Sequence, residues 1–150
     1  MDTERVTDAV LDDAWANLAQ LHDGRIAHGN PWVGNVVLDA NGTTALVGLG
    51  DAVPSATDAR LRLDRVQLLA TSAELVGEER ALAAAHRGLS TGDLVELLAF
   101  LEPTALTGAA KRHVTNTKKL LAGLRDAGAE LTGVEPPKPA ELHRFSLSMV

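Results

Sequence analysis

The chain has 150 residues, no Cys and a formal net charge of −6 at pH 7. This length suits one domain with a buried core, and the lack of Cys excludes disulfides, thiolate metal sites and cysteine nucleophiles. Hydrophobic residues make up 45% of the chain and aromatic residues only 3%, so Leu, Val and Ala must build the core. This composition predicts a mostly α-helical domain.

The first residues are acidic and lack the apolar stretch of a signal peptide. No apolar run approaches the roughly 20 residues that a membrane-spanning helix needs. We therefore expect a cytoplasmic protein.

A first helix is predicted from about residue 6 to Asp23, because apolar residues recur there at three- and four-residue steps. Asp2 or Thr3 is expected to cap its start, and Gly24 follows its end. The apolar positions are Val6, Val10, Leu11, Ala14, Trp15, Leu18 and Leu21.

A β-hairpin is predicted after the next loop. Two short β-prone runs, 36–38 and 45–47, flank Asn41-Gly42, a dipeptide typical of tight hairpin turns. Residues 48–62 are expected to be irregular, because glycine and proline interrupt any periodicity.

Four further helices are predicted, at 64–76, 78–88, 91–101 and 108–131. Asp64 is expected to open the first of them as its N-cap. Three prolines between 133 and 139 indicate a stiff linker. The predicted organisation is one domain over residues 1–132, followed by a linker and tail over 133–150.

A series of short motifs surrounds the predicted hairpin. They are Leu21-His22, His28-Gly29-Asn30, Asn35-Val36-Val37-Leu38, Asn41-Gly42 and Gly48-Leu49-Gly50-Asp51-Ala52. This order resembles the C-terminal lobe of the protein-kinase-like fold, in particular the aminoglycoside phosphotransferase and lipopolysaccharide kinase branch. The resemblance covers roughly residues 10–106. It implies an α+β fold of helix, loop, β-hairpin and four helices, with the N-terminal lobe absent.

A narrower resemblance concerns the end of the chain. Val134-Glu135-Pro136-Pro137, followed by Leu142-His143-Arg144-Phe145, looks like the junction after the kinase-like cytosolic domain of actinobacterial lysylphosphatidylglycerol-synthase-like membrane proteins. This resemblance implies a location at the inner face of the plasma membrane.

The chain departs from the phosphotransferase pattern where the chemistry occurs. Asn30 stands at the position of the catalytic Asp, and an amide cannot take a proton near neutral pH. Gly48 stands at the position of the metal-binding Asp, whereas Asn35 matches the second metal ligand. Asp51 lies three residues past the lost position as a candidate substitute, although an exposed turn aspartate is the simpler interpretation. We therefore expect no metal site and no cofactor, because Mg²⁺ is usually held by carboxylates.

The nucleotide cradle is also missing from the sequence. Only 27 residues precede His28, and none of them is Lys, whereas kinase-like enzymes hold ATP with a glycine-rich loop and a strand lysine. The resemblance further implies structural roles for His28, which holds the loop, and for Asp64, which accepts N–H groups of that loop.

The charge is distributed unevenly. Residues 1–102 hold 7 Lys or Arg against 16 Asp or Glu, and residues 103–150 hold 7 against 4. If residues 108–131 form one helix, its cations fall within a limited arc. This strip is a candidate surface for a membrane protein or for anionic lipid, and the net acidity argues against nucleic acid. Its members are Lys111, Arg112, Lys118, Lys119 and Arg125.

The sequence thus predicts a catalytically inactive, kinase-like regulatory or scaffolding module associated with a membrane transport-type protein. One alternative is a small-molecule phosphotransferase, using ATP and Mg²⁺, whose N-terminal lobe comes from another chain. The other alternative is a plain helical interaction domain.

Overall fold

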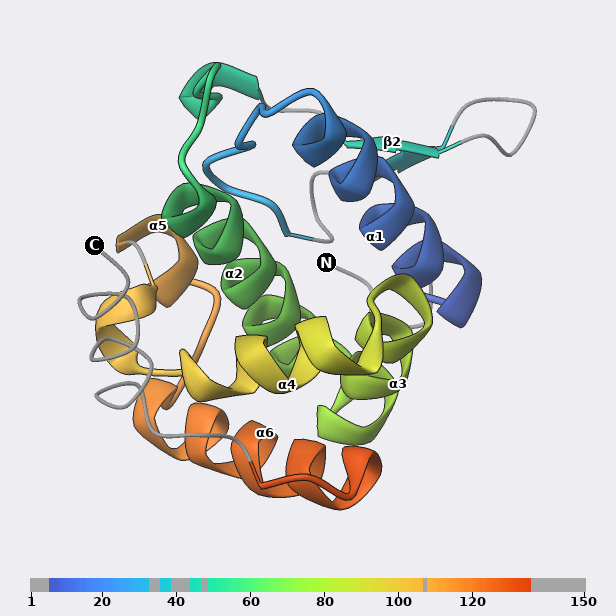
Figure 1. Ribbon diagram of the computed structural model, residues 1–150, viewed down its shortest axis with the longest axis vertical. Coiled ribbons are helices and arrows are strands. Elements are labelled where there is room, and N and C mark those ends of the chain that lie inside the picture. Colours follow the sequence, from blue (N-terminus) through green and yellow to red (C-terminus); the bar gives the residue numbers. More distant parts are fainter. Residues whose placement is uncertain (1–5, 33–35, 39–43, 47–48, 107, 136–150) are drawn as a thin grey trace.

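The computed structural model describes residues 6–32, 36–38, 44–46, 49–106 and 108–135. The fold is mostly helical, as expected from the composition (Figure 1). The helices are α1 (Asp8–Asp23), α2 (Asp58–Val76), α3 (Glu78–Gly88), α4 (Thr91–Ala99), α5 (Gly108–Lys111) and α6 (Thr117–Thr132), with short 3₁₀ turns η3 (Leu49–Asp51) and η4 (Pro103–Ala105).

Helix α1 begins later than the sequence indicated. Thr7 is its N-cap, and the Thr7 hydroxyl accepts a hydrogen bond from Val10 N at 3.2 Å, so the expected cap at Asp2 or Thr3 is wrong. Val6 precedes the cap and lies in the same core cluster as Leu11, the arrangement of a hydrophobic staple. The predicted end at Asp23 is confirmed.

Helix α2 runs through the centre of the fold, and nearly all of its residues from 66 to 73 are buried. It begins at Asp58, because the hydroxyl of Thr57 accepts a hydrogen bond from Arg60 N. The prediction that Asp64 caps this helix is therefore wrong, since Asp64 lies one and a half turns inside it. The start of α2 also falls in a stretch that was expected to be irregular.

Helices α1 and α3 lie side by side (Figure 1). Arg80 pairs with Asp8 at 3.0 Å, and Arg87 pairs with Asp12 at 2.8 Å. Gly88 allows the two helices to approach closely, because a Cβ atom at this position would meet the side chain of Trp15. Helix α3 has the predicted bounds, 78–88.

Two short strands, β1 (Val36–Leu38) and β2 (Thr44–Leu46), pair antiparallel with Val37 opposite Ala45. The turn predicted at Asn41-Gly42 lies outside the described residues. The strands sit at the edge of the molecule, next to α1 (Figure 1).

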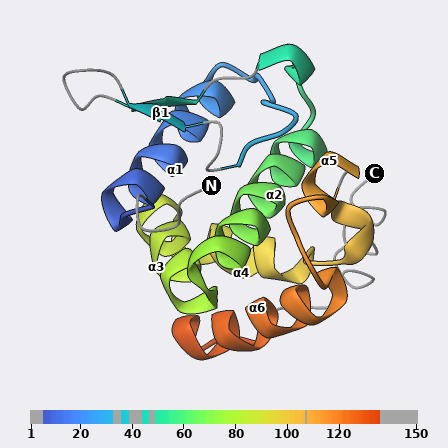
Figure 2. The same ribbon diagram turned by 180° about the vertical axis from the view of Figure 1, so that it is seen from behind.

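The predicted helix over 108–131 is wrong, because α5 ends at Lys111 and α6 begins at Thr117. The Asn116 side chain caps α6 by accepting a hydrogen bond from Lys119 N at 3.1 Å. Asparagine favours helix starts over helix interiors, because its side chain can bond to nearby backbone groups in this way. Seen from behind, the connection passes alongside α2 (Figure 2), where the Glu74 carboxylate accepts bonds from the backbone and hydroxyl of Thr115.

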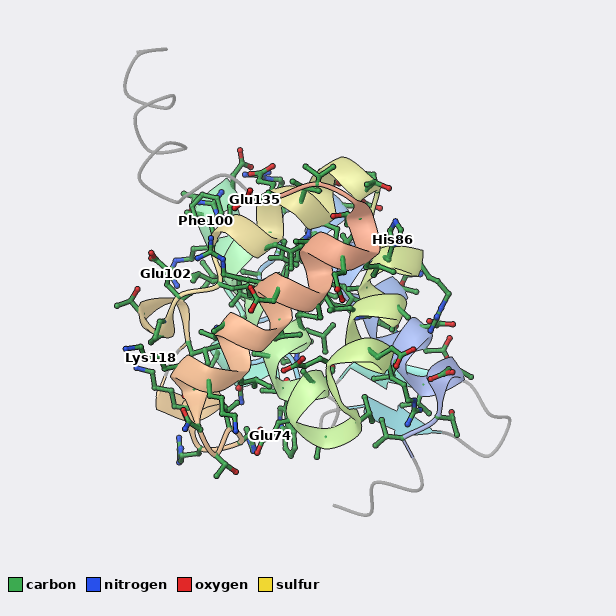
Figure 3. All side chains as sticks on the ribbon, turned by 90° about the horizontal axis from the view of Figure 1, so that it is seen from below. Glu74, His86, Phe100, Glu102, Lys118 and Glu135 are labelled. Atoms are coloured by element: carbon green, nitrogen blue, oxygen red, sulfur yellow. The ribbon has the colours of Figure 1, made fainter. Side chains whose placement is uncertain are left out.

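Helix α6 crosses the base of the molecule, with Lys118 near its start and Glu135 beyond its end (Figure 3). It ends at Gly133, which adopts the left-handed conformation with φ of 70°. Residues 136–150 of the predicted linker and tail lie outside the described residues. Within the part of the chain that the structure describes, no helix combines the length and apolar character needed to cross a bilayer.

Candidate functional site

A buried carboxylate holds the start of the 28–32 loop. Asp64 is 1% exposed. Its Oδ2 accepts a hydrogen bond from His28 N at 2.6 Å, and its Oδ1 accepts one from Gly29 N at 3.0 Å. The expectation that Asp64 accepts N–H groups from this loop is therefore met. A buried carboxylate requires such bonds, because an unpaired buried charge is very costly.

Two histidines complete this network. His22, at the end of α1, lies with its Nε2 2.9 Å from Asp64 Oδ2, and both side chains are almost fully buried. His28 is 0% exposed, and its Nδ1 accepts a hydrogen bond from Asn30 N at 3.2 Å. His28 thus fixes the backbone of the next residues from the core, in keeping with the structural role implied for it.

Asp51 lies against this loop. Gly29 has a φ of 92°, and a Cβ atom there would clash with the backbone carbonyl and the Cβ of Asp51. Only glycine tolerates both the conformation and the close approach. The structure thus places an exposed carboxylate-bearing residue next to the loop that carries Asn30.

A short backbone ladder produces this approach. Ala27 and Val53 exchange two hydrogen bonds of 3.0 and 2.9 Å, and Ala56 N donates to Arg25 O. The Arg25 side chain binds Ala56 O and Asp58 Oδ1, and its hydrogen bond holds the pKa of Asp58 below the usual range. No local pattern predicts this ladder, because neither of its two segments alternates apolar and polar residues.

Trp32 joins the other end of the loop to the α5–α6 connection. Its ring stacks on His113 with centroids 3.8 Å apart and planes at 20°. Trp32 is half-buried, and Pro31 beside it is buried. Nothing in the local pattern of the sequence pairs His113 with Trp32, because the two residues lie far apart in the chain.

The donor set at the loop is a poor match for Mg²⁺. Asn30 supplies a neutral amide, and Asp51 supplies one carboxylate on the neighbouring segment. Asn35 and Gly48, the expected metal-loop positions, lie outside the described residues. Among the residues that are described, no three His, Asp or Glu side chains gather in the manner of a metal site. A site of this kind does not fit the carboxylate-rich coordination that Mg²⁺ prefers.

The five cations do not form one strip, because two elements carry them. Lys111 and Arg112 lie at the end of α5 and in the following turn, whereas Lys118, Lys119 and Arg125 lie on α6. The prediction of a continuous arc is therefore wrong, since it depended on an unbroken helix.

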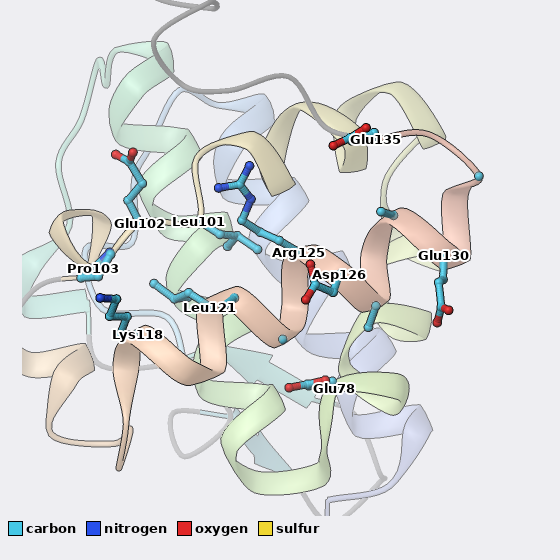
Figure 4. Close-up of a pocket in the computed structure, with 15 residues that line it drawn as sticks. Glu78, Leu101, Glu102, Pro103, Lys118, Leu121, Arg125, Asp126, Glu130 and Glu135 are labelled. Atoms are coloured by element: carbon cyan, nitrogen blue, oxygen red, sulfur yellow. The ribbon is translucent and has the colours of Figure 1, made fainter.

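Two of these cations line a broad groove on the α6 side of the molecule (Figure 4). Its volume is about 1200 Å³. Lys118 and Arg125 share this groove with five carboxylates, so its local charge is acidic: Glu78, Glu102, Asp126, Glu130 and Glu135. The groove is a separate surface from the Asp64 network, none of whose residues lines it.

Comparison with known proteins gives no relative for this chain. No family model matches the sequence, and neither a curated protein nor a solved structure matches it.

Proposed function

We propose that this protein is a kinase-like regulatory or scaffolding module without phosphotransferase activity. The observation that carries the proposal is the Asp64 network. A buried carboxylate on the central helix accepts two consecutive amides of the His28-Gly29-Asn30 loop. In the fold that the chain resembles, an Asp in this position braces the catalytic loop. Here it braces a loop whose acid position carries Asn30.

The chemistry of the loop supports a non-catalytic role. A phosphotransferase base orients the acceptor hydroxyl and takes its proton. The amide of Asn30 can orient a hydroxyl, but it cannot accept the proton near neutral pH. With a donor set that fits Mg²⁺ poorly, neither the nucleophile nor the phosphate charge would be assisted.

The proposed setting is the cytoplasmic face of a membrane, next to a transport-type protein. Its support is the narrower resemblance of the region after Gly133 and the concentration of cations between Lys111 and Arg125, a stretch without Asp or Glu. Basic residues near a membrane segment are attracted by anionic lipid.

A second candidate is a phosphotransferase that receives its N-terminal lobe from another chain. One observation favours it: Asp51 contacts Gly29, so a carboxylate lies beside the loop despite Asn30. In this reading Asp51 takes the role of base or metal ligand. A plain helical interaction domain is the third candidate, and it requires no nucleotide.

The deciding experiment is a phosphotransfer assay on the full chain. The protein is incubated with Mg-ATP and a panel of aminoglycosides, sugars and lipids, beside an active aminoglycoside phosphotransferase as positive control. We expect no product above the buffer control. The double variant Asn30→Asp/Gly48→Asp is also expected to be inactive, because none of the 27 residues before His28 is the lysine with which kinase-like enzymes position the nucleotide.

Turnover by the wild-type chain would refute the proposal, and its loss in Asp51→Asn would favour the second candidate. Calorimetry with Mg-ATP separates the remaining two. Binding without turnover supports a kinase-like module that retains nucleotide, whereas a helical interaction domain is expected to bind none.

A further inference from the structure

We propose that the corner formed by Lys111, Arg112, His113 and Trp32 binds a phosphate-bearing anion. This basic corner adjoins the loop that carries Asn30, so the inference assigns an anionic ligand class to the candidate site. It rests on the proposed function in taking that loop as the ligand-facing loop of a kinase-like domain.

The fold exposes Lys111 and Arg112 beside the half-buried His113. Ala110 and Val114, on either side of them, are buried in the core. Val114 N donates to Lys111 O, and His113 N donates to Ala110 O, so the backbone between these anchors forms a tight turn.

The Trp32–His113 stack fixes this turn against the loop. Arg112 precedes the stacked His113 by one residue, and Lys111 precedes it by two. Because consecutive Cα atoms are about 3.8 Å apart, both cations are attached to the backbone close to the stack. On its other side the turn is held by Glu74, which binds Thr115. The corner is therefore positioned at both ends before any ligand arrives, which reduces the ordering cost of binding.

The two cations are not neutralised. Within the described residues, neither Lys111 nor Arg112 forms an ion pair, whereas arginines elsewhere pair with carboxylates: Arg25, Arg62, Arg80 and Arg87. Two carboxylates lie on adjoining segments, Glu74 bonded to Thr115 and Asp51 beside Gly29. Among the residues that the structure describes, neither of these two carboxylates forms an ion pair with Lys111 or Arg112.

The combination of groups suits phosphate. Arginine offers a planar fork of donors that matches phosphate oxygens, and lysine adds a compact positive charge. The neighbouring loop carries the neutral Asn30 two residues before Trp32, so it adds no carboxylate at that position that would repel an anion. A free phosphate compound and a lipid headgroup present the same chemistry, so the ligand class is a phosphate ester or anhydride from either source.

The test measures two probes against matched variants. The free-phosphate probe is inorganic pyrophosphate, titrated by calorimetry and by the fluorescence of Trp32. The headgroup probe is cosedimentation with vesicles of phosphatidylglycerol and phosphatidylcholine, compared with phosphatidylcholine alone. The variant Lys111→Gln/Arg112→Gln removes the corner, and Lys118→Gln/Arg125→Gln removes the same charge from the groove.

We expect the corner variant to weaken binding about tenfold or more, because two direct charge contacts are lost. The groove variant is expected to weaken it less than about threefold, since screening limits distant charges. Trp32→Phe is expected to abolish the fluorescence change, because the other tryptophan, Trp15, is buried and packs beside Gly88.

If pyrophosphate binds and the corner variant weakens that binding more than the groove variant does, the ligand is a free phosphate compound. If only the phosphatidylglycerol vesicles bind, with the same difference between the variants, the ligand is a lipid headgroup. Binding of neither probe at low salt, or equal weakening by both double variants, would overturn the inference. That failure would leave the phosphotransfer result untouched, so the two proposals can fail separately.

Discussion

The Asp64 network makes a strong prediction about stability. Replacement of Asp64 by Ala removes the acceptor of the His28 and Gly29 amides and the partner of the His22 ring. All three groups lie at buried or partly buried positions, where little water replaces the lost bonds. We therefore expect Asp64→Ala to be among the most destabilising single changes in the chain.

The size of the effect follows from the bonds. Each donor left without an acceptor costs about 1–3 kcal/mol, so the two amides alone give about 2–6 kcal/mol. Asp64→Asn keeps the volume and one carbonyl oxygen, so it is expected to cost about half as much. The control is Asp58→Ala on the same helix, whose exposed pair with Arg25 is screened by solvent.

Urea denaturation followed by circular dichroism measures these differences. With a slope of about 2 kcal/mol per M, in the middle of the usual range, Asp64→Ala shifts the midpoint by roughly 1–3 M, and Asp58→Ala shifts it little. Hydrogen exchange adds an independent measure, because the amides of His28 and Gly29 are both expected to be protected in the wild type, and one of the two is expected to lose protection in Asp64→Asn. This measure holds even if Asp64→Ala does not fold.

Equal midpoint shifts for Asp64→Ala and Asp58→Ala would refute the reasoning. So would rapid exchange of the His28 and Gly29 amides in the wild-type protein. Either result would mean that the loop is not held by the carboxylate.

Two further predictions use paired glycines. Gly29→Ala is expected to destabilise the protein by at least about 2 kcal/mol, because its positive φ is strained for alanine and the added methyl meets the Asp51 backbone. The control is Gly50→Ala, whose added methyl has no described atom within 4 Å. Equal losses of stability in the two variants would contradict the close approach of Gly29 to Asp51. Gly128→Ala is expected to destabilise by about 1–3 kcal/mol, because its methyl would press on the buried side chain of Leu98. In Gly123→Ala the added methyl meets only the movable carboxylate of Glu78. This change is expected to be neutral or stabilising, because alanine has a helix propensity about 1 kcal/mol better than glycine. Thermal unfolding measures both variants, and a change in stability of the same sign for Gly128→Ala and Gly123→Ala would contradict this packing.

Helix positions could be predicted where local signals were unambiguous. The span 78–88 lies between Gly77 and Leu89, and its apolar spacing leaves one choice of face. The start of α2 was missed because Arg and Leu alternate over residues 60–63 after Thr57, and apolar residues recur at helical spacing only beyond Asp64. An aspartate before an apolar run has the same local pattern whether it caps a helix or lies buried within one.

The break between α5 and α6 was missed for a related reason. Apolar positions continue at helical spacing through Val114, which is buried after α5 has ended. Asn116 was the local sign of a new helix, because asparagine is a strong N-cap. The predicted cation strip was wrong as a consequence, because residues at helical spacing share one face only when a single continuous helix carries them.

One partner of the loop, Asp64, was predicted, but the other contacts that hold the loop were not. Asp64 accepts two amides of the loop, as the resemblance implied. The Ala27–Val53 ladder and the Trp32–His113 stack join segments far apart in the chain. Such pairs depend on how helices pack, and no local spacing encodes them.

The geometry of the loop and its chemistry are separable. Asp64 binds backbone amides at His28 and Gly29, and His28 binds the amide of Asn30. None of these three bonds requires a particular side chain at position 30, so a carboxylate there can be replaced by an amide without loss of the brace. The brace therefore describes how the loop is held and carries no information about activity. The Trp32–His113 stack joins this loop to the turn that carries exposed Lys111 and Arg112, so the proposed anion site can be tested without any assumption about phosphoryl transfer.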